Sequence, residues 1–291
     1  MSANSLAQAS YDYQRRWAWL RRWLPRPARR ALRACHLLTL DGMDLCLGRS
    51  RAYLVPPRWL NPIGDGDFED TGAEFLDYFI RFGGLERSHH VLDVGCGIGR
   101  MARPLTNYLT TGTYEGFDIA PRGVQWCEEN ISPRYPRFHF SLADIRNREY
   151  NPHGLVIASD YRFPHEDASF DFALLTSVFT HLRPLEVSHY LAELRRVLTS
   201  GGKCLATFFL INEESRSLIE SGQSSLDLSQ AIPGCWTTSL RVPETAIGYE
   251  ETCLMQMIRE QGLTLKSLHF GNWCGRAEYL SYQDVVVLAK R

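Results

Sequence analysis

Short apolar segments alternate with segments of helical spacing between residues 90 and 211. The apolar segments have the length of buried strands, and the segments between them repeat apolar residues at intervals of three and four. This alternation predicts βαβ units and a parallel sheet. The expected strands cover residues 90–94, 113–118, 137–142, 170–175 and 203–211, and the expected helices cover about 99–110, 121–131 and 184–198.

Two regions of the chain have a different pattern of apolar and polar residues from that of residues 90–211. Residues 1–85 begin with a basic, Trp-rich helical pattern to about Leu38, continue through a stretch rich in glycine and proline, and regain helical spacing at 74–82. Residues 212–248 are polar, rich in turns and too long for a simple connection, so we expect them to form a lid. A helix near 250–261 and strands near 263–270 and 282–289 follow. We therefore divide the chain into an N-terminal extension or cap, 1–85, and a domain, 86–291, with the insertion 212–248.

Composition narrows the class of protein. The chain has 291 residues, 44% of them hydrophobic and 22% charged, and a formal net charge of −1. These values are ordinary for a globular enzyme and give no general electrostatic reason to expect a nucleic-acid partner. The 8 cysteines form no CxxC pair and no cluster with zinc-ligand spacing, so they indicate reduced thiols and no metal site. With no signal-peptide pattern and no apolar run of membrane-spanning length, a cytoplasmic location is expected.

The N-terminal segment has a charge pattern of its own. Eight arginines lie between positions 15 and 33, opposed nearby by Asp12 alone, and Trp17, Leu20 and Leu24 stand among them. Three hypotheses remain open for this segment: a cap over an active site, a helix at a membrane surface, and a nucleic-acid contact. The last is the weakest, because the patch is short and the rest of the chain balances its charge. The oligomeric state cannot be inferred from the sequence.

A glycine-rich turn follows the first expected strand, in Val91-Leu92-Asp93-Val94-Gly95-Cys96-Gly97-Ile98-Gly99-Arg100. Glycines allow a tight turn and let a ligand approach the backbone, and the next helix offers free N–H groups. The dinucleotide fingerprint requires Gly-x-Gly-x-x-Gly, but position 100 is Arg, and the spacing here is Gly-x-Gly-x-Gly. An acid, Asp93, also precedes the first glycine by two residues. The second and third expected strands end in further acids, Asp118 and Asp144.

In this order, these motifs resemble the class I S-adenosylmethionine (SAM)-dependent methyltransferases, strongly over about 88–211 and moderately over 250–290. The resemblance implies an α/β, doubly wound, Rossmann-like sheet of seven strands with the last strand antiparallel, preceded by the helical extension. It implies SAM as the cofactor, with Asp118 binding the ribose hydroxyls, Ile119 beside the adenine, and Asp144 facing the adenine amino group. We prefer Asp144 to Asp160 because Asp144 ends a strand-like run. The complete expected cofactor site is Asp93, Gly95, Cys96 (its thiol packing), Gly97, Gly99, Arg100, Asp118, Ile119, Asp144, Ile145, Thr176, Ser177 and Val178.

The expected catalytic residue is His181, which follows the fourth strand at the edge where doubly wound sheets bind ligands. Histidine titrates near neutrality, so it is a candidate general base for a hydroxyl acceptor, and a packing or cofactor-contacting role is the alternative. We expect O-methylation of a small molecule, sugar or lipid-linked acceptor. Methylation of a protein or RNA, and a non-catalytic SAM-binding module, are the other hypotheses. No Asn/Asp-Pro-Pro-Tyr/Phe motif follows the fourth strand, where Thr176-Ser177-Val178-Phe179 stands, and this disfavours amino methylation.

Overall fold

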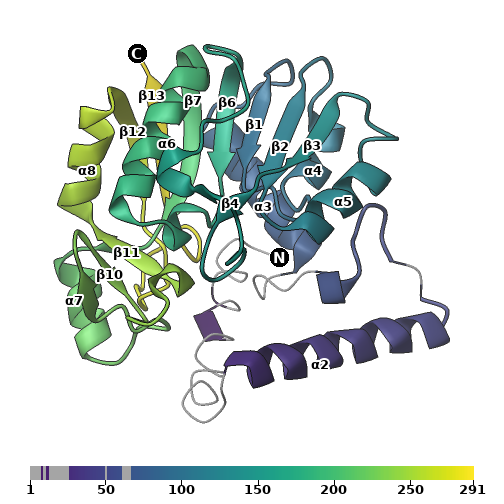
Figure 1. Cartoon of the computed structure of the whole chain (residues 1–291), viewed down its shortest axis with the longest axis horizontal. Helices are drawn as coiled ribbons and strands as arrows, with labels where there is room; N and C mark the ends of the chain where they lie inside the picture. The colour runs from purple at the N-terminus through teal and green to yellow at the C-terminus, as the bar shows by residue number, and fades with distance from the viewer. Residues whose placement is uncertain (1–7, 9–10, 13–25, 50, 61–66) are drawn as a thin grey trace.

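A computed structural model describes residues 8, 11–12, 26–49, 51–60 and 67–291. The expected Trp-rich segment around Trp17, Leu20 and Leu24 lies outside these residues. The described chain forms a large sheet with helices on both faces, a smaller sheet beside it, and one long helix at the periphery (Figure 1).

The large sheet has seven strands in the order β12-β13-β7-β6-β1-β2-β3. Neighbours from β7 to β3 pair in parallel, whereas β13 pairs antiparallel with both β7 and β12. The predicted fold class, a doubly wound sheet whose last strand is antiparallel, is therefore confirmed. The strands are β1 (Val91–Val94), β2 (Tyr114–Asp118), β3 (Phe138–Leu142), β6 (Phe170–Leu175), β7 (Leu198–Phe208), β12 (Leu263–His269) and β13 (Asp284–Lys290).

Helices cover both faces because each buries an apolar stripe against the sheet. On one face, α3 (Phe68–Arg81), α4 (Ala102–Tyr108) and α5 (Pro121–Asn130) share a buried cluster with the sheet, in which Phe79 contacts Phe172 edge to face. On the other face, α6 (Pro184–Val197) and α8 (Glu251–Glu260) bury Leu191 and Leu254. The helix α3 thus packs on the sheet, although it lies within the segment that the sequence assigned to the extension.

Two boundaries differ from the sequence-based expectation. The pair Gly201-Gly202 was expected to turn into the fifth strand, but it lies inside β7, which already begins at Leu198. The register with β6 steps from Phe170↔Leu198 to Phe172↔Lys203, so the glycines form an irregularity within the strand rather than a loop before it. In addition, the N-terminal helix was expected to end near Leu38, but α2 spans Arg26–Cys46. A strong 3.6-residue repeat of apolar positions continues through that range.

The insertion forms a second sheet of four strands in the order β8-β11-β10-β9. After β8 (Leu210–Ile211), the chain forms α7 (Glu213–Glu220), β9 (Gln230–Ile232), β10 (Cys235–Thr237) and the 3-10 turn η4 (Pro243–Thr245), and it returns as β11 (Ile247–Glu250). β11 pairs in parallel with β8. A further small ladder joins β4 (Ile145–Arg146) to β5 (Val156–Ile157), which precedes the 3-10 turn η2 (Ala158–Asp160).

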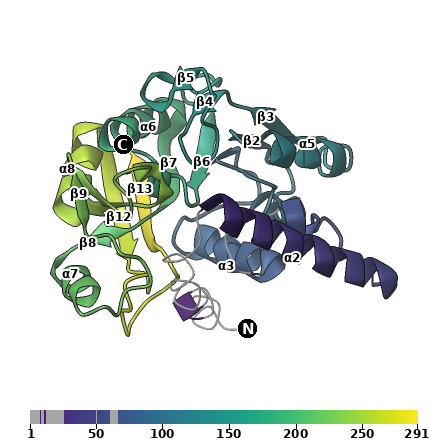
Figure 2. The same cartoon turned by 60° about the horizontal axis from the view of Figure 1, so that its bottom comes forward.

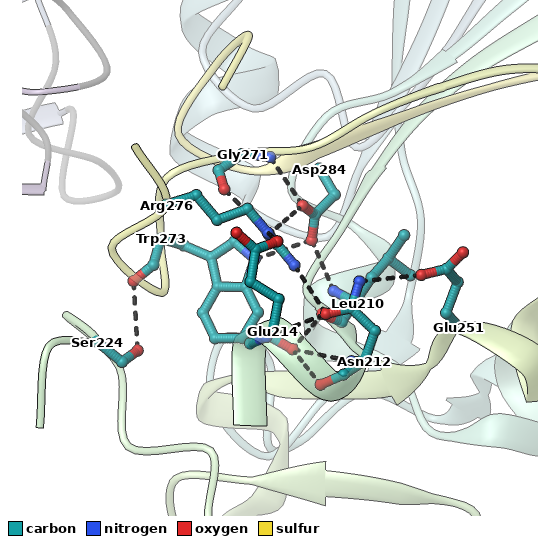
Figure 3. A network of polar contacts seen from close by, with 10 residues as sticks. Leu210, Asn212, Glu214, Ser224, Glu251, Gly271, Trp273, Arg276 and Asp284 are labelled. Atoms are coloured by element: carbon teal, nitrogen blue, oxygen red, sulfur yellow. Dashed lines mark hydrogen bonds and ion pairs between the residues drawn. The ribbon is translucent and has the colours of Figure 1, made fainter. Parts of the chain in front are cut away.

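A buried ion pair between Arg276 and Asp284 lies where the segment after β12 meets the large sheet, and Arg276 also pairs with Glu214 of the insertion at 2.8 Å (Figure 3). The Asp284 carboxylate, at the start of β13, accepts hydrogen bonds from Arg276 Nη1 at 3.0 Å and from the indole N–H of Trp273 at 2.8 Å. Two backbone amides, of Leu210 at 2.6 Å and Gly271 at 2.8 Å, complete its set of donors. Burial raises the pKa of Asp284 to about 6, although Arg276 and these donors lower it. The carboxylate is therefore charged at neutral pH and fully satisfied.

Candidate cofactor and acceptor site

The glycine loop lies at the carboxyl end of β1 and leaves one position open. Gly95, Gly97 and Gly99 have φ values of 82°, 56° and 78°, in the left-handed region that favours glycine. A Cβ on Gly95 would come within 2.4 Å of Val178, whereas a Cβ on Gly97 would meet no atom of the described chain within 4 Å. The loop therefore packs tightly at Gly95 and exposes bare backbone at Gly97, where a ligand can approach.

Asp118 ends β2 directly beside this loop. Its carboxylate accepts the backbone N–H of Gly97 at 2.8 Å and that of Ala120 at 2.7 Å. Burial raises the pKa of Asp118, while these amides lower it. Each oxygen accepts one of these hydrogen bonds, and an ionised carboxylate oxygen can accept more than one donor, so the carboxylate can bind a further polar group beside Gly97.

Asp93 lies beneath the loop and is fully buried. One of its carboxyl oxygens accepts the Tyr114 hydroxyl at 2.5 Å, and the other has no hydrogen-bond partner in the part of the chain that the structure describes. Burial raises the pKa of Asp93 to about 7, with a further rise from the nearby Asp118 charge. A buried carboxyl oxygen without a partner is costly, and a cationic group bound at the loop would lower that cost.

The expected adenine side of the site is formed by residues that follow β2 and β3. Ile119 packs partly buried against the core, and Ile145 is fully buried in it. The backbone amide of Ala143 donates to the carbonyl of Asp118, the last residue of β2, at 2.9 Å. Asp144 is the next residue after Ala143, so its exposed side chain lies near the end of β2. Asp160 lies farther along the chain in η2, where it accepts a hydrogen bond from the Ser159 hydroxyl.

Thr176, Ser177 and Val178 follow β6, and Val178 packs over Gly95. Ser177 has a φ of 60°, a conformation that costs free energy for a residue with a side chain. Hydrogen bonds hold it there: its N–H donates to Thr207 Oγ1 at 2.8 Å, and its hydroxyl donates to the amide oxygen of Gln283 at 3.0 Å. Strain of this kind accumulates at binding sites, where the fold over-determines the backbone.

Arg100 and Cys96 have partners within the protein. The Arg100 guanidinium lies 5.9 Å from the centre of the Phe68 ring on α3. Cys96 is buried, burial raises the pKa of its thiol, and a Cβ on Gly116 would contact it. The cysteine therefore fills the space beneath the loop, and its side chain has the packing role expected from the sequence.

His181 ends the short 3-10 turn η3 (Phe179–His181) and contacts the insertion. Its Nδ1 lies 2.8 Å from the carbonyl oxygen of Glu244, and its Nε2 lies 3.3 Å from the Tyr150 hydroxyl. Because a carbonyl only accepts, Nδ1 carries the proton of the neutral ring, and Nε2 is the acceptor that faces the Tyr150 hydroxyl. Burial lowers the pKa of His181 below its ordinary value of 6.5. The imidazole is therefore neutral at neutral pH.

Sequence reasoning missed three residues of this region. Tyr150 lies edge to face against the His181 ring at a centroid distance of 5.0 Å. Thr207 and Gln283 hold Ser177, and the Thr207 hydroxyl donates to the Gln283 amide oxygen at 2.6 Å. Tyr150 follows no motif, and Gln283 is separated from Ser177 by 106 positions, so no local pattern reveals either contact. The only sequence feature that pointed to Gln283 is its position just before the last strand, at an end of the sheet.

The sheet order, the antiparallel last strand and a glycine loop followed by an acid-terminated strand define the class I SAM-dependent methyltransferase fold. Residues 92–206 match the methyltransferase domain family, so this part of the chain is a methyltransferase domain of that class.

Among sequence relatives, the chain is 33% identical over 117 residues to phthiotriol/phenolphthiotriol dimycocerosates methyltransferase 1 of Mycobacterium ulcerans. It is also 33% identical over 121 residues to the fatty-acid O-methyltransferase of Mycolicibacterium smegmatis. Each match covers 40% of this chain and 36% of the relative. The similarity thus spans about a third of the length of these relatives.

Solved structures share the fold. A protein of Pyrococcus horikoshii OT3 superposes with a TM-score of 0.52 at 18% identity, over 77% of this chain and 91% of that chain. Magnesium protoporphyrin IX methyltransferase from Synechocystis PCC 6803, solved with bound S-adenosylhomocysteine, superposes with a TM-score of 0.51 at 14% identity, over 80% of this chain and 92% of that chain.

Within the described ranges, no helix has the length and apolar character needed to cross a bilayer. The same residues contain no group of three His, Cys, Asp or Glu side chains arranged to hold a metal ion.

Proposed function

We propose that this chain transfers a methyl group from SAM to a hydroxyl group of a lipid or lipid-linked small molecule. The observation that carries the proposal is the open backbone at Gly97 beside the Asp118 carboxylate, at the carboxyl end of a doubly wound sheet. This is the edge at which such sheets bind ligands.

The residues at this edge fit the chemical groups of SAM. Asp118 has lone pairs for two ribose hydroxyls, and the glycine loop offers backbone close to the amino-acid end of the cofactor. The partnerless oxygen of Asp93 favours a cation near the loop, and the SAM ammonium is one. Ile119 and Asp144 would border the adenine. When bound, SAM supplies an electrophilic methyl group, and the protein must position the acceptor oxygen and remove its proton.

The proposed proton acceptor is Nε2 of His181. The Glu244 carbonyl fixes the tautomer by accepting from Nδ1, so Nε2 faces the Tyr150 hydroxyl as a base. A hydroxyl acceptor has two routes for its proton, directly to Nε2 or to the Tyr150 oxygen while the phenol donates its own proton to Nε2. In both routes His181 gains one proton and Tyr150 ends with the proton count at which it began.

The acceptor class rests on the names of the relatives. Two relatives are named for lipid substrates, dimycocerosates and fatty acids. The insertion contacts His181 through the Glu244 carbonyl, and its Leu226 and Leu228 pack in a buried cluster with Phe209 and Trp273.

The cofactor proposal predicts that Asp118→Ala weakens SAM binding by about 1–3 kcal/mol, because charge-assisted bonds to the ribose hydroxyls are lost. Isothermal titration calorimetry with SAM and with S-adenosylhomocysteine measures this change. Asp118→Asn shows how much of the loss in SAM affinity is due to the negative charge, since this variant keeps the side-chain size and one acceptor oxygen.

Asp77→Ala is the matched control, because Asp77 is an exposed carboxylate on α3 whose partner is Arg81. SAM affinity should be unchanged in this variant. Equal affinity in the wild-type protein and in Asp118→Ala would remove Asp118 from the site. Tighter binding of NAD than of SAM would contradict the cofactor assignment itself.

A further inference from the structure

The long helix α2 presents an apolar face that no other described element covers. Exposed apolar side chains recur along it at intervals of four, three and seven residues, at Ala31, Cys35, Leu38 and Leu45. Its larger apolar side chains, Leu32, Leu38, Met43 and Leu45, are between 52% and 81% exposed. Figure 1 shows α2 standing apart from the body at the bottom of the molecule, and Figure 2 shows the same helix with the bottom turned forward.

The opposite side of α2 is fixed to the protein. Asp41 is buried and pairs with Arg51 at 3.2 Å and Arg58 at 3.3 Å, and Asp44 pairs with Arg58 at 2.5 Å. The backbone N–H of Trp59 also donates to Asp41. These contacts hold α2 against the 3-10 turn η1 (Arg58–Leu60) and determine which face points outward.

The charged and aromatic residues around α2 indicate which kind of partner would bind its exposed apolar face. Residues 26–58 contain seven arginines and two aspartates, and both aspartates are paired. Four of these arginines fall within the first eight residues of α2, and the first acid of this helix is Asp41. Exposed Tyr53 and Trp59 follow the helix. Apolar face, excess arginine and flanking Tyr and Trp together match the headgroup region of an anionic membrane.

We propose that α2 docks this chain on the surface of an anionic lipid bilayer, with Leu32, Leu38, Met43 and Leu45 entering the acyl boundary. The location of the helix suits this role. The C-terminus, at the end of β13, lies at the top of Figure 1, and β13 runs against the other strands of the large sheet, so their carboxyl ends face downward, toward α2. A membrane bound by α2 would therefore lie on the same side as the glycine loop. The docking itself does not depend on the methyltransferase proposal, because its readout is membrane binding.

The test is co-sedimentation of the full chain with phosphatidylcholine vesicles, with and without an equal amount of phosphatidylglycerol. The wild-type chain should sediment with the anionic vesicles, and added salt should weaken the binding. Leu38→Asp/Leu45→Asp should lower the vesicle affinity by about a hundredfold or more, because two leucines no longer enter the bilayer. The control is Leu155→Asp/Leu185→Asp, which makes the same change at leucines 85% and 79% exposed elsewhere on the surface. It should bind like the wild type.

A second measurement avoids charge changes on the helix. A polarity-sensitive fluorophore is attached to Cys46, which is exposed on α2, in a chain whose other exposed cysteines, Cys35 and Cys253, are serine. Its emission should shift to the blue when anionic vesicles are added. Absence of wild-type sedimentation, or equal sedimentation of Leu38→Asp/Leu45→Asp, would overturn the proposal. A dimer in analytical ultracentrifugation that these aspartates convert to a monomer, without vesicle binding, would also overturn it, because a second copy would then cover the face.

Discussion

Asp284→Ala is expected to lower the free energy of unfolding by about 3–5 kcal/mol, because it removes the buried countercharge of Arg276, whose other partner, Glu214, is largely exposed to solvent. Arg276 and Asp284 side chains are 1% and 0% exposed, so water cannot replace the lost partner. The substitution also removes the acceptor of the Leu210 and Gly271 amides and of the Trp273 indole. Chemical denaturation followed by circular dichroism and tryptophan fluorescence measures the loss.

Two variants make this result specific. Asp77→Ala removes a carboxylate from the exposed Arg81–Asp77 pair and should change stability by no more than about 1 kcal/mol. Arg276→Met/Asp284→Leu removes both charges together and should recover part of the loss, since no charge is then buried alone. If Asp284→Ala costs no more than Asp77→Ala, the network does not stabilise the fold in the way we describe.

His181→Ala is expected to lower the rate of methyl transfer about 10²–10⁴-fold, the usual contribution of general acid–base catalysis, and to leave SAM affinity nearly unchanged. Tyr150→Phe distinguishes the two proton routes, because only the route through the phenol requires its hydroxyl. Single-turnover methylation with both substrates saturating is the appropriate measurement, since it separates chemistry from binding and release. The matched control is His189→Ala, which removes a histidine whose ring also bonds to a backbone carbonyl, that of Tyr161.

The pH dependence of the rate follows from the same geometry. The base acts in its neutral form, and burial places the pKa of His181 below 6.5. The rate should therefore be independent of this group at neutral and higher pH and should fall as the pH drops through the lowered pKa. A loss below about tenfold in His181→Ala would exclude His181 as an essential base. Weaker SAM binding in that variant, with little effect on the bound-state rate, would indicate the packing role instead.

Local patterns predicted most of the large sheet. Apolar strands and amphipathic helices depend on residues near in sequence, so Phe170–Leu175 was located to the residue and other strands within a few residues. The antiparallel direction of β13 came from family resemblance, because periodicity carries no strand direction. Inside β7, the Gly201-Gly202 pair looked like a turn, whereas pairing with β6 on both sides of it keeps the strand continuous.

In the candidate site, too, some residues were predictable from the sequence and others were not. Asp118 and the glycine loop are neighbours because consecutive parallel strands end at the same edge, and sequence order alone implies this. The contacts of His181 with Tyr150 and Glu244 join residues 31 and 63 positions apart, and they depend on how the insertion folds back. No periodicity encodes that fold-back. The same holds for Gln283, which reaches Ser177 only because β13 is inserted beside β7.

The parallel pairing of β8 with β11 also has a consequence for how such a chain can vary. Leu210 lies opposite Tyr249, and Ile211 lies opposite Glu250, so the chain leaves the small sheet from β8 and rejoins it on the neighbouring strand, β11. The length and composition of the segment between these points can then change while its two ends stay fixed. A segment anchored in this way, residues 213–246, can diverge in sequence between related proteins while the strands of the large sheet stay the same.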